Sequence, residues 1–203
     1  DLGDDLFTRL ITRHPAMERP LYEAATDVLV QLYSAPMPDL EPLGPRLMAE
    51  MSGLVMRKYR AGILGTNDED LLARFENNFE DILRATVKGG HVIVQRDYHA
   101  ENLLWLPERD GVARAGLLDF QDARSGHPAY DLVSLLQDAR RDVPAGIEMQ
   151  MIARFIEKTG VEDSGFRTAY AVLGVQRNLR ILGVFARLSL DRGKPHYVDL
   201  IPR

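Results

Sequence analysis

Apolar residues recur along most of this chain at the spacing of an α-helix. After Pro20, positions 21, 24, 25, 28 and 32 are apolar, which places them on one face of a helix that proline can begin. The same spacing recurs in five further segments: residues 46–60, 66–88, 128–136, 147–156 and 169–190. The second of these begins with a capping-box sequence at 66–69. A chain built mainly from helices is therefore expected.

Between the third and fourth of these helices the pattern changes from helical to strand-like. A glycine pair at 89–90 precedes an apolar run at 91–94, which suits a buried strand. Residues 103–106 and 115–118 are predicted to form two strands, joined by a turn at 107–111. The sequence therefore predicts a mainly α protein with a small β-hairpin region, which is an α+β fold.

Composition and charge describe one globular unit and exclude several classes of partner. The chain has 203 residues, 45% of them hydrophobic, and a formal net charge of −5. This mild negative charge argues against a nucleic-acid or anionic-membrane surface. The absence of cysteine excludes disulfides and thiolate zinc sites, and no apolar run is long enough for a transmembrane helix or a signal peptide. A cytoplasmic protein is expected.

Candidate chemistry begins directly after the strand at 91–94. Asp97 precedes Asn102 by five residues, a spacing that lets a short loop direct a carboxylate at a substrate hydroxyl and an amide oxygen at Mg²⁺. Taken alone the pair is a weak pattern, because Asp and Asn are common in loops for the hydrogen bonds they make to their own backbone. The predicted hairpin strengthens it, since the returning strand brings Asp119 beside Asn102. Few protein oxygens suffice for Mg²⁺.

These segments resemble the C-terminal lobe of the protein-kinase-like phosphotransferases, the group of aminoglycoside, choline and related small-molecule kinases. The resemblance is carried residue by residue at Asp97, Asn102 and Asp119, and it implies a catalytic Asp97, metal ligands Asn102 and Asp119, and the cofactors ATP and Mg²⁺. Residues 95–104, 118–123, 128–136 and 174–187 resemble more closely the bacterial kinases that phosphorylate the C1 hydroxyl of N-acetylmuramate and N-acetylglucosamine.

The resemblance also suggests roles for five further residues. Gln95 stands where relatives usually have a histidine that braces the metal-binding segment, and Asp131 matches a buried aspartate that braces the catalytic loop. His99 either contacts the transferred phosphate or Asp97, or braces the loop. Asp122 either joins the metal shell or caps the loop. Arg177 either binds an anionic group of the substrate, such as a carboxylate or a phosphate, or is a surface charge or a partner of an Asp side chain.

On this basis residues 1–203 are expected to form a single kinase-like C-terminal lobe. Residues 1–5 would be a hinge remnant, 91–122 the catalytic loop and metal-binding hairpin, and 128–203 a helical subdomain, with the last residues, 199–203, cut short of a final helix. The chain has no glycine-rich phosphate loop and no strand lysine of the kind that grips a nucleotide. We therefore expect a fragment that lacks the N-terminal lobe and is inactive alone.

The expected activity of the intact protein is ATP-dependent phosphorylation of a small-molecule hydroxyl, and the resemblance implies the anomeric hydroxyl of an N-acetylated amino sugar. An aminoglycoside- or choline-type kinase remains open as an alternative, as does a degenerate kinase-like binding module. The expected partner is the small-molecule substrate, with no nucleic acid and no membrane. The sequence gives no indication of the oligomeric state.

Overall fold

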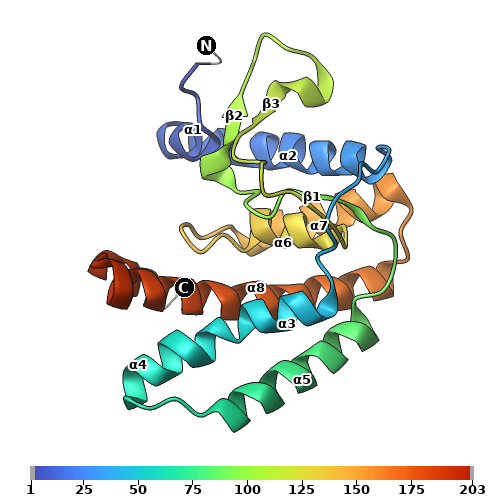
Figure 1. Ribbon diagram of the computed structural model, residues 1–203. Coiled ribbons are helices and arrows are strands. Elements are labelled where there is room, and N and C mark those ends of the chain that lie inside the picture. The colour runs from blue at the N-terminus through green and yellow to red at the C-terminus, as the bar shows by residue number, and fades with distance from the viewer. Residues whose placement is uncertain (1–2, 202–203) are drawn as a thin grey trace.

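The chain folds into helices stacked around two short pairs of strands. A computed structural model describes residues 3–201 (Figure 1). Its α-helices are α1 (Phe7–Arg13), α2 (Glu18–Tyr33), α3 (Pro45–Ser52), α4 (Ala61–Leu64), α5 (Glu69–Thr86), α6 (Ala129–Leu136), α7 (Ala145–Thr159) and α8 (Asp163–Arg192). Short 3-10 or π turns are η1 (Pro15–Met17), η2 (Val55–Arg60), η3 (Ala100–Asn102), η4 (Gly111–Arg114) and η5 (Pro195–Leu200). The predicted fold class is confirmed.

The strands form two separate antiparallel pairs. The predicted hairpin is present as β2 (Leu103–Trp105) and β3 (Ala115–Leu117), with Leu103 opposite Leu117. The predicted buried strand is β1 (Val92–Val94), and its partner β4 (Arg124–Gly126) was not predicted, because a polar tripeptide has no strand pattern. Gly126 fits there because a Cβ atom would lie 3.1 Å from Val94 Cγ2.

Three predicted helices differ from the structure in their boundaries. The helix predicted over residues 46–60 is divided, since α3 ends at Ser52 and the π-helix η2 leads into α4. The N-cap of α5 is Asp68 and not Thr66, because the Asp68 carboxylate accepts a hydrogen bond from the Leu71 N–H at 2.9 Å. Helix α8 begins six residues before the predicted start, at Asp163, where the Glu162 carboxylate accepts hydrogen bonds from two backbone N–H groups.

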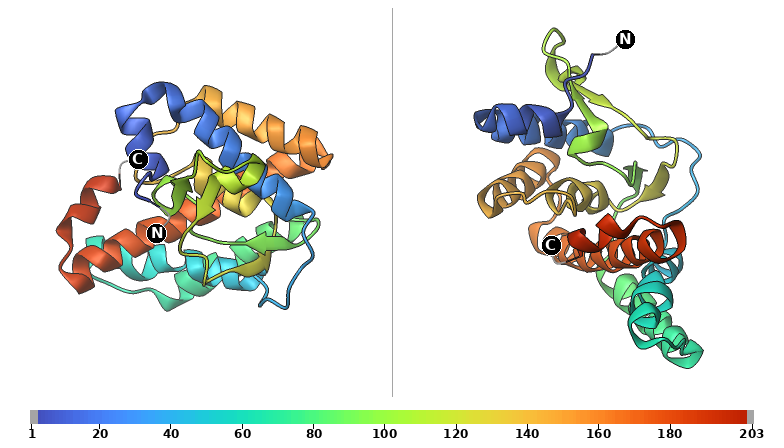
Figure 2. Two further views of the ribbon diagram at one scale, coloured as in Figure 1. Left: turned by 90° about the horizontal axis from the view of Figure 1, so that it is seen from above. Right: turned by 90° about the vertical axis from the view of Figure 1, so that its left-hand side faces the viewer.

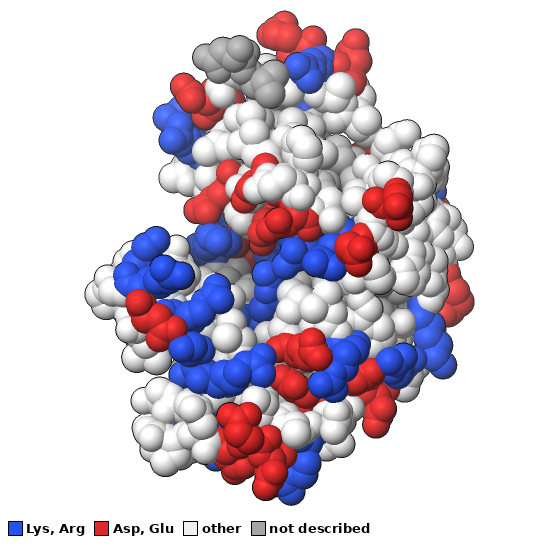
Figure 3. Space-filling view, in the orientation of Figure 1, with Lys and Arg blue, Asp and Glu red and all other residues white. Residues whose placement is uncertain are grey.

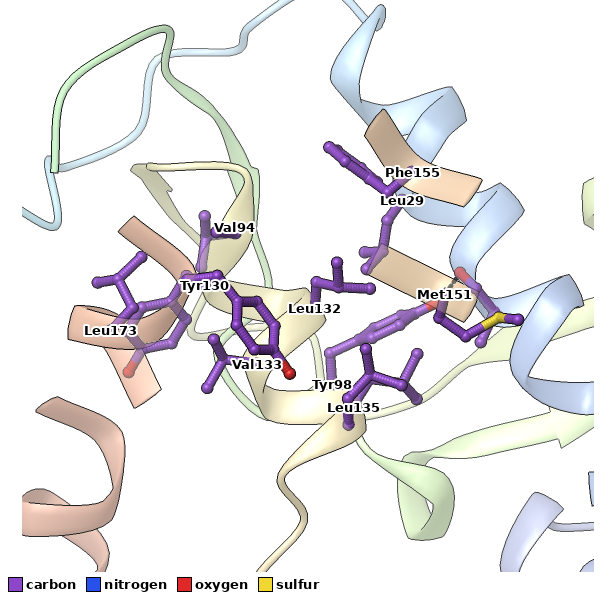
Figure 4. Packing of buried hydrophobic residues seen from close by; sticks show 14 of the residues in the cluster. Leu29, Val94, Tyr98, Tyr130, Leu132, Val133, Leu135, Met151, Phe155 and Leu173 are labelled. Atoms are coloured by element: carbon purple, nitrogen blue, oxygen red, sulfur yellow. Dashed lines mark hydrogen bonds between the residues drawn. The ribbon is translucent and has the colours of Figure 1, made fainter. Parts of the chain in front are cut away.

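The hairpin and the helices form layers (Figures 1 and 2). Helices α1 and α2 lie beside the hairpin, α6 and α7 lie beneath them, α8 and α3 form the next layer, and α5 lies outermost. The α6 helix is the centre of this stack, because all eight of its residues are buried. Its Leu132 and Leu135 lie near Tyr98 and Met151, whereas its opposite face meets Leu173 of α8 (Figure 4). Helix α6 is therefore the buried element against which the loop after β1 packs.

The N-terminal segment joins the open edge of the hairpin. Of the predicted hinge remnant at 1–5, residues 1 and 2 lie outside the described residues. The Asp5 carbonyl accepts a hydrogen bond from the Trp105 N–H at 2.8 Å, and Leu6 forms an antiparallel bridge with Leu104. At the other end, residues 202 and 203 of the predicted truncation also lie outside the described residues. No helix within residues 3–201 is long and apolar enough to cross a membrane.

Gly183 allows α8 to approach η2 closely. A Cβ atom at this position would lie 2.5 Å from the carbonyl carbon of Leu54 and 2.7 Å from the backbone N of Val55. We expect Gly183→Ala to lower the free energy of unfolding by about 1–3 kcal/mol, because the two backbones must move apart. Urea denaturation measures this change. In the matched variant Gly146→Ala, also helical, the new methyl group meets no atom within 4 Å, so equal destabilisation of both variants would contradict the account.

His127 closes the turn that leads into α6. Its Nδ1 accepts a hydrogen bond from the Ala129 N–H at 3.1 Å, and its Nε2 lies 3.1 Å from the Lys88 carbonyl. The ring is therefore neutral with the proton on Nε2. Burial lowers its pKa from 6.5 to about 4.

This lowered pKa predicts a pH-dependent stability. Because the unfolded state binds a proton at His127 below pH 6.5 and the folded state only near pH 4, the histidine's contribution is present above pH 6.5 and is lost as the pH falls to 4. The expected loss is roughly 2 kcal/mol, reduced from the full shift because the ring is partly exposed. Denaturation of wild type and His127→Asn at pH 7 and pH 4.5 measures it. An identical pH dependence of both proteins would contradict the assignment.

Candidate active site

The loop that follows β1 is held by Asp131 of α6. The Asp131 carboxylate is 2% exposed and accepts hydrogen bonds from the backbone N–H groups of Gln95, at 2.6 Å, and Arg96, at 2.9 Å. Burial raises the pKa of Asp131 to about 6, and these two hydrogen bonds and the charge of Arg177 act in the opposite direction. Asp131 thus holds the start of the loop through two backbone N–H groups.

The carbonyl of Arg96 is held from the other side. It accepts hydrogen bonds from Ser134 Oγ of α6, at 3.3 Å, and from Arg177 Nη1 of α8, at 3.0 Å. Arg96 itself has a φ of 74°, a left-handed conformation that is uncommon for a residue other than glycine. Three side chains from two helices therefore fix the peptide units directly before Asp97.

Asp97 is half-buried, and its carboxylate makes no hydrogen bond or ion pair within residues 3–201. Its backbone carbonyl accepts a hydrogen bond from Asn102 Nδ2 at 2.9 Å. The Asn102 amide is thereby oriented so that its Oδ1 remains available as a ligand. The Asp97 carboxylate and the Asn102 amide oxygen thus have no hydrogen-bond partner in the described part of the chain.

The hairpin brings Asp119 back beside this loop. The Leu118 N–H donates to the Asn102 carbonyl at 3.0 Å, which continues the β2–β3 pairing by one residue and places Asp119 next. Asp119 is exposed, has a φ of 59°, and accepts a short hydrogen bond from Gln121 Nε2 at one carboxylate oxygen. Arg96 and Asp119 are the two non-glycine residues with positive φ among the described residues, and both belong to this site.

The donor set fits Mg²⁺ better than a transition metal. No group of three or more His, Asp and Glu side chains that could hold a metal ion occurs in the described part of the chain. Mg²⁺ does not need such a group, because one or two protein oxygens with water and phosphate oxygens complete its shell. Asn102 Oδ1 and the second carboxylate oxygen of Asp119 are suitable. The Asp122 backbone carbonyl accepts a hydrogen bond from Arg96 Nη1 at 3.4 Å, and both alternatives for its carboxylate stay predictions.

His99 is buried beneath the loop. Its Nε2 lies 3.5 Å from both Asn102 Nδ2 and Arg140 Nη1. Burial, reinforced by the charge of Arg140, lowers its pKa to about 4, so the ring is neutral at pH 7. A neutral ring in contact with Asn102 fits the bracing alternative better than an ionic contact with phosphate.

The altered brace expected of the Gln95 side chain stays a prediction. Its Nε2 is buried and finds no acceptor in the described part of the structure. The hydrogen bonds that hold the loop come from Asp131, Ser134 and Arg177 and go to its backbone.

Arg177 lies under the loop and is 4% exposed. Arg177 forms no ion pair among residues 3–201, and its Nε is buried there without a hydrogen-bond partner. The structure therefore places Arg177 against the backbone of Arg96. An Asp ion pair, one of the alternatives for this residue, is not formed.

Sequence reasoning missed the anchor of the loop on α2 and its link to the next segment. The Tyr98 hydroxyl donates to the Ala25 carbonyl at 2.8 Å, and an aromatic residue within a polar loop was the available signal. Glu101 forms an ion pair with Arg140 at 3.1 Å, for which sequence spacing offered no signal.

In Figure 3, acidic side chains gather in the middle of one face directly above a band of basic side chains.

Comparisons with known proteins agree with this geometry. Residues 6–169 match the family model of the phosphotransferase enzyme family, APH. The chain is 41% identical over 221 aligned positions to an N-acetylmuramate/N-acetylglucosamine kinase from Caulobacter vibrioides, covering 100% of this chain and 59% of the relative. It is 30% identical over 214 positions to a protein of the same name from Pseudomonas aeruginosa, covering 100% of this chain and 61% of that relative.

Solved structures show the same fold at much lower identity. An ADP-bound aminoglycoside phosphotransferase, APH(2'')-Ib, superposes with a TM-score of 0.61 and 13% identity, over 100% of this chain and 67% of the other. A macrolide 2'-phosphotransferase of type I gives 0.56 and 17%, over 89% of this chain and 56% of the other. The chain spans about 60% of the length of its kinase relatives. The resemblance to this family is confirmed, and the chain belongs to the phosphotransferase enzyme family.

Proposed function

We propose that this chain is the catalytic C-terminal lobe of a kinase that transfers the γ-phosphoryl group of ATP to the anomeric hydroxyl of N-acetylmuramate or N-acetylglucosamine. The observation that carries the proposal is the Asp97 carboxylate, which is half-buried and makes no hydrogen bond or ion pair within residues 3–201. It lies in the same loop as Asn102, whose carbonyl accepts a hydrogen bond from the residue before Asp119. The names of the two kinase relatives support the choice of acceptor. Because ATP is the donor, the proposal places the reaction in the cytoplasm.

Each residue has one role in the proposed reaction. Asp97 orients the acceptor hydroxyl and accepts its proton as the new O–P bond forms and the bond from the γ-phosphorus to the β–γ bridging oxygen of ATP breaks, which releases ADP. Asn102 and Asp119 would hold Mg²⁺, which offsets the charge on the phosphates in the transition state. Asp131, Ser134 and Arg177 keep the backbone before Asp97 in place. Residues 91–122 would then be the catalytic loop and metal-binding hairpin, and 128–203 the helical subdomain.

Phosphorylation of an aminoglycoside is the second candidate. It is favoured by the solved structures with the same fold, which include aminoglycoside phosphotransferases, but their identity of 13% supports the fold alone. The kinase relatives at 41% and 30% identity favour the amino sugars.

An ADP-release assay on the protein produced from its complete gene distinguishes the two candidates. With MgATP, release should depend on added N-acetylglucosamine or N-acetylmuramate and not on kanamycin. Release that depends on kanamycin alone would replace the proposed acceptor. Nucleotide binding without release in the presence of any of the three would favour a degenerate binding module.

A further inference from the structure

Arg140 connects the segment that joins α6 to α7 with the turn that ends at Asn102. Its Nε forms an ion pair with Glu101 Oε2 at 3.1 Å, and its Nη1 lies 3.5 Å from His99 Nε2. Its backbone N–H donates to Asp138 Oδ1 at 3.0 Å, which fixes the base of the side chain. The Arg140 guanidinium is thereby directed at the His99 ring.

The Nε2 atom of His99 faces two groups that can only donate hydrogen bonds. One is Arg140 Nη1, and the other is Asn102 Nδ2, which also lies 3.5 Å away. Nε2 must therefore carry the lone pair that accepts from both. The proton of the neutral ring then lies on Nδ1.

The other side of the His99 ring does not select this tautomer. A histidine tautomer is commonly set by the hydrogen bond that the second ring nitrogen makes. Here Nδ1 is buried and has no hydrogen-bond partner within residues 3–201. A buried N–H without an acceptor is unfavourable, so the selection must come from the donors at Nε2, of which Arg140 carries the positive charge.

The tautomer of His99 decides how the Asn102 amide is oriented. Asn102 Nδ2 donates to the Asp97 carbonyl at 2.9 Å, and its second hydrogen is available for His99 Nε2. The amide oxygen, Oδ1, is then left for a metal ion. A proton on Nε2 would make the ring a donor at that atom, which favours the opposite orientation of the amide, with Oδ1 toward the ring.

We propose that Arg140 is a positioning residue that keeps the lone pair of His99 on Nε2 and thereby holds Asn102 Oδ1 available for Mg²⁺. The inference rests on the proposed kinase function and adds a residue that acts on its metal site through another side chain. The side chains of Arg140 and Glu101 are 36% and 48% exposed, and ion pairs this exposed contribute little to stability. An effect of Arg140 on metal binding can therefore be separated from unfolding.

The first measurement is ¹⁵N NMR of the histidine ring nitrogens, without metal, on the protein from its complete gene. The His99 signals are those that disappear in His99→Asn. We expect the proton on Nδ1 in wild type and a shift of the ring population toward a proton on Nε2 in Arg140→Met. Arg141→Met is the matched control, because it removes the neighbouring arginine, whose guanidinium contacts Glu18 and Tyr22 of α2.

The second measurement is equilibrium binding of Mn²⁺ in the presence of ADP, followed by the electron paramagnetic resonance signal of free Mn²⁺. We expect Arg140→Met to raise the Kd for Mn²⁺ about tenfold and Arg141→Met to leave it unchanged. This is the lower end of the roughly 10–100-fold effect of groups that orient a metal ligand. In turnover, the Mg²⁺ concentration for half-maximal rate should rise by the same factor, and kcat at saturating Mg²⁺ should return toward wild type.

Three results would overturn the inference while leaving the proposed function intact. They are a proton on Nε2 of His99 in wild type, an unchanged Mn²⁺ affinity in Arg140→Met, and equal effects of Arg140→Met and Arg141→Met. If Arg140→Met does not fold, Glu101→Ala at an exposed position replaces it in both measurements, because it releases the Arg140 guanidinium from the side of Nε.

Failure of the proposed function has a different signature, because neither measurement requires turnover. If wild type phosphorylates none of the sugars but Arg140→Met still shifts the tautomer and weakens Mn²⁺ binding, the positioning role stands and the proposed function fails. If wild type binds no Mn²⁺ in the presence of ADP, both are refuted.

Discussion

Replacing Asp97 with asparagine is expected to lower kcat by about 10²–10⁴-fold and to change the affinity for MgATP less than about threefold. The size of the decrease is that of losing a positioned general base. Asparagine keeps the shape of the side chain but cannot accept the proton of the acceptor hydroxyl. The carboxylate makes no hydrogen bond or ion pair within residues 3–201, so its loss should not weaken the fold.

Initial rates and equilibrium nucleotide binding, both on the protein from its complete gene, measure these quantities. Asp81→Asn, at an exposed position of α5, removes one negative charge far from the site and controls for net charge. A kcat within tenfold of wild type for Asp97→Asn would contradict the role of Asp97. Equal losses of kcat and of nucleotide affinity would indicate that the substitution disturbs the whole loop.

Replacing Asp131 with alanine is expected to lower the free energy of unfolding by about 2–4 kcal/mol and to abolish detectable turnover. The change leaves the N–H groups of Gln95 and Arg96 without their acceptor, and each unsatisfied buried donor costs about 1–3 kcal/mol. It also removes the buried carboxylate whose pKa the charge of Arg177 lowers. The loop before Asp97 would no longer be fixed.

Ser134→Ala provides the matched comparison for this effect. It removes a single hydrogen bond of 3.3 Å to the carbonyl of Arg96 from the same helix, so a loss of about 0.5–1.5 kcal/mol and a smaller decrease in kcat are expected. Chemical denaturation and initial rates measure both variants. Similar stabilities of Asp131→Ala and wild type would show that the brace is not energetically important.

The fold was predictable from sequence where one physical signal dominated. The period of apolar residues identified α2, α5, α7 and most of α8, and the turn at 107–111 between two apolar runs identified the hairpin. Other elements depend on contacts between distant parts of the chain. The strand β4 exists because β1 offers it hydrogen bonds, and α3 gives way to the π-helix η2 in the region where Gly183 lets α8 approach. Such contacts leave no local pattern.

The site residues were likewise predictable where the signal is local and not where it depends on contacts between distant segments. The D-x-x-x-x-N spacing and the hairpin were sufficient to place Asn102 and Asp119 together, because both are local features. The support of the loop was only partly predictable, since Asp131, Ser134 and Arg177 reach it from sequence separations of 35 residues or more.

The most direct test of the central claim is phosphorus NMR of the protein from its complete gene, with MgATP and N-acetylglucosamine labelled with ¹³C at C1. The account predicts a new phosphomonoester signal that is split by the labelled carbon and that does not form with Asp97→Asn. A product without this coupling would place the phosphate on another hydroxyl. The absence of any phosphorylated sugar from the wild-type reaction, while MgATP still binds, would contradict the account.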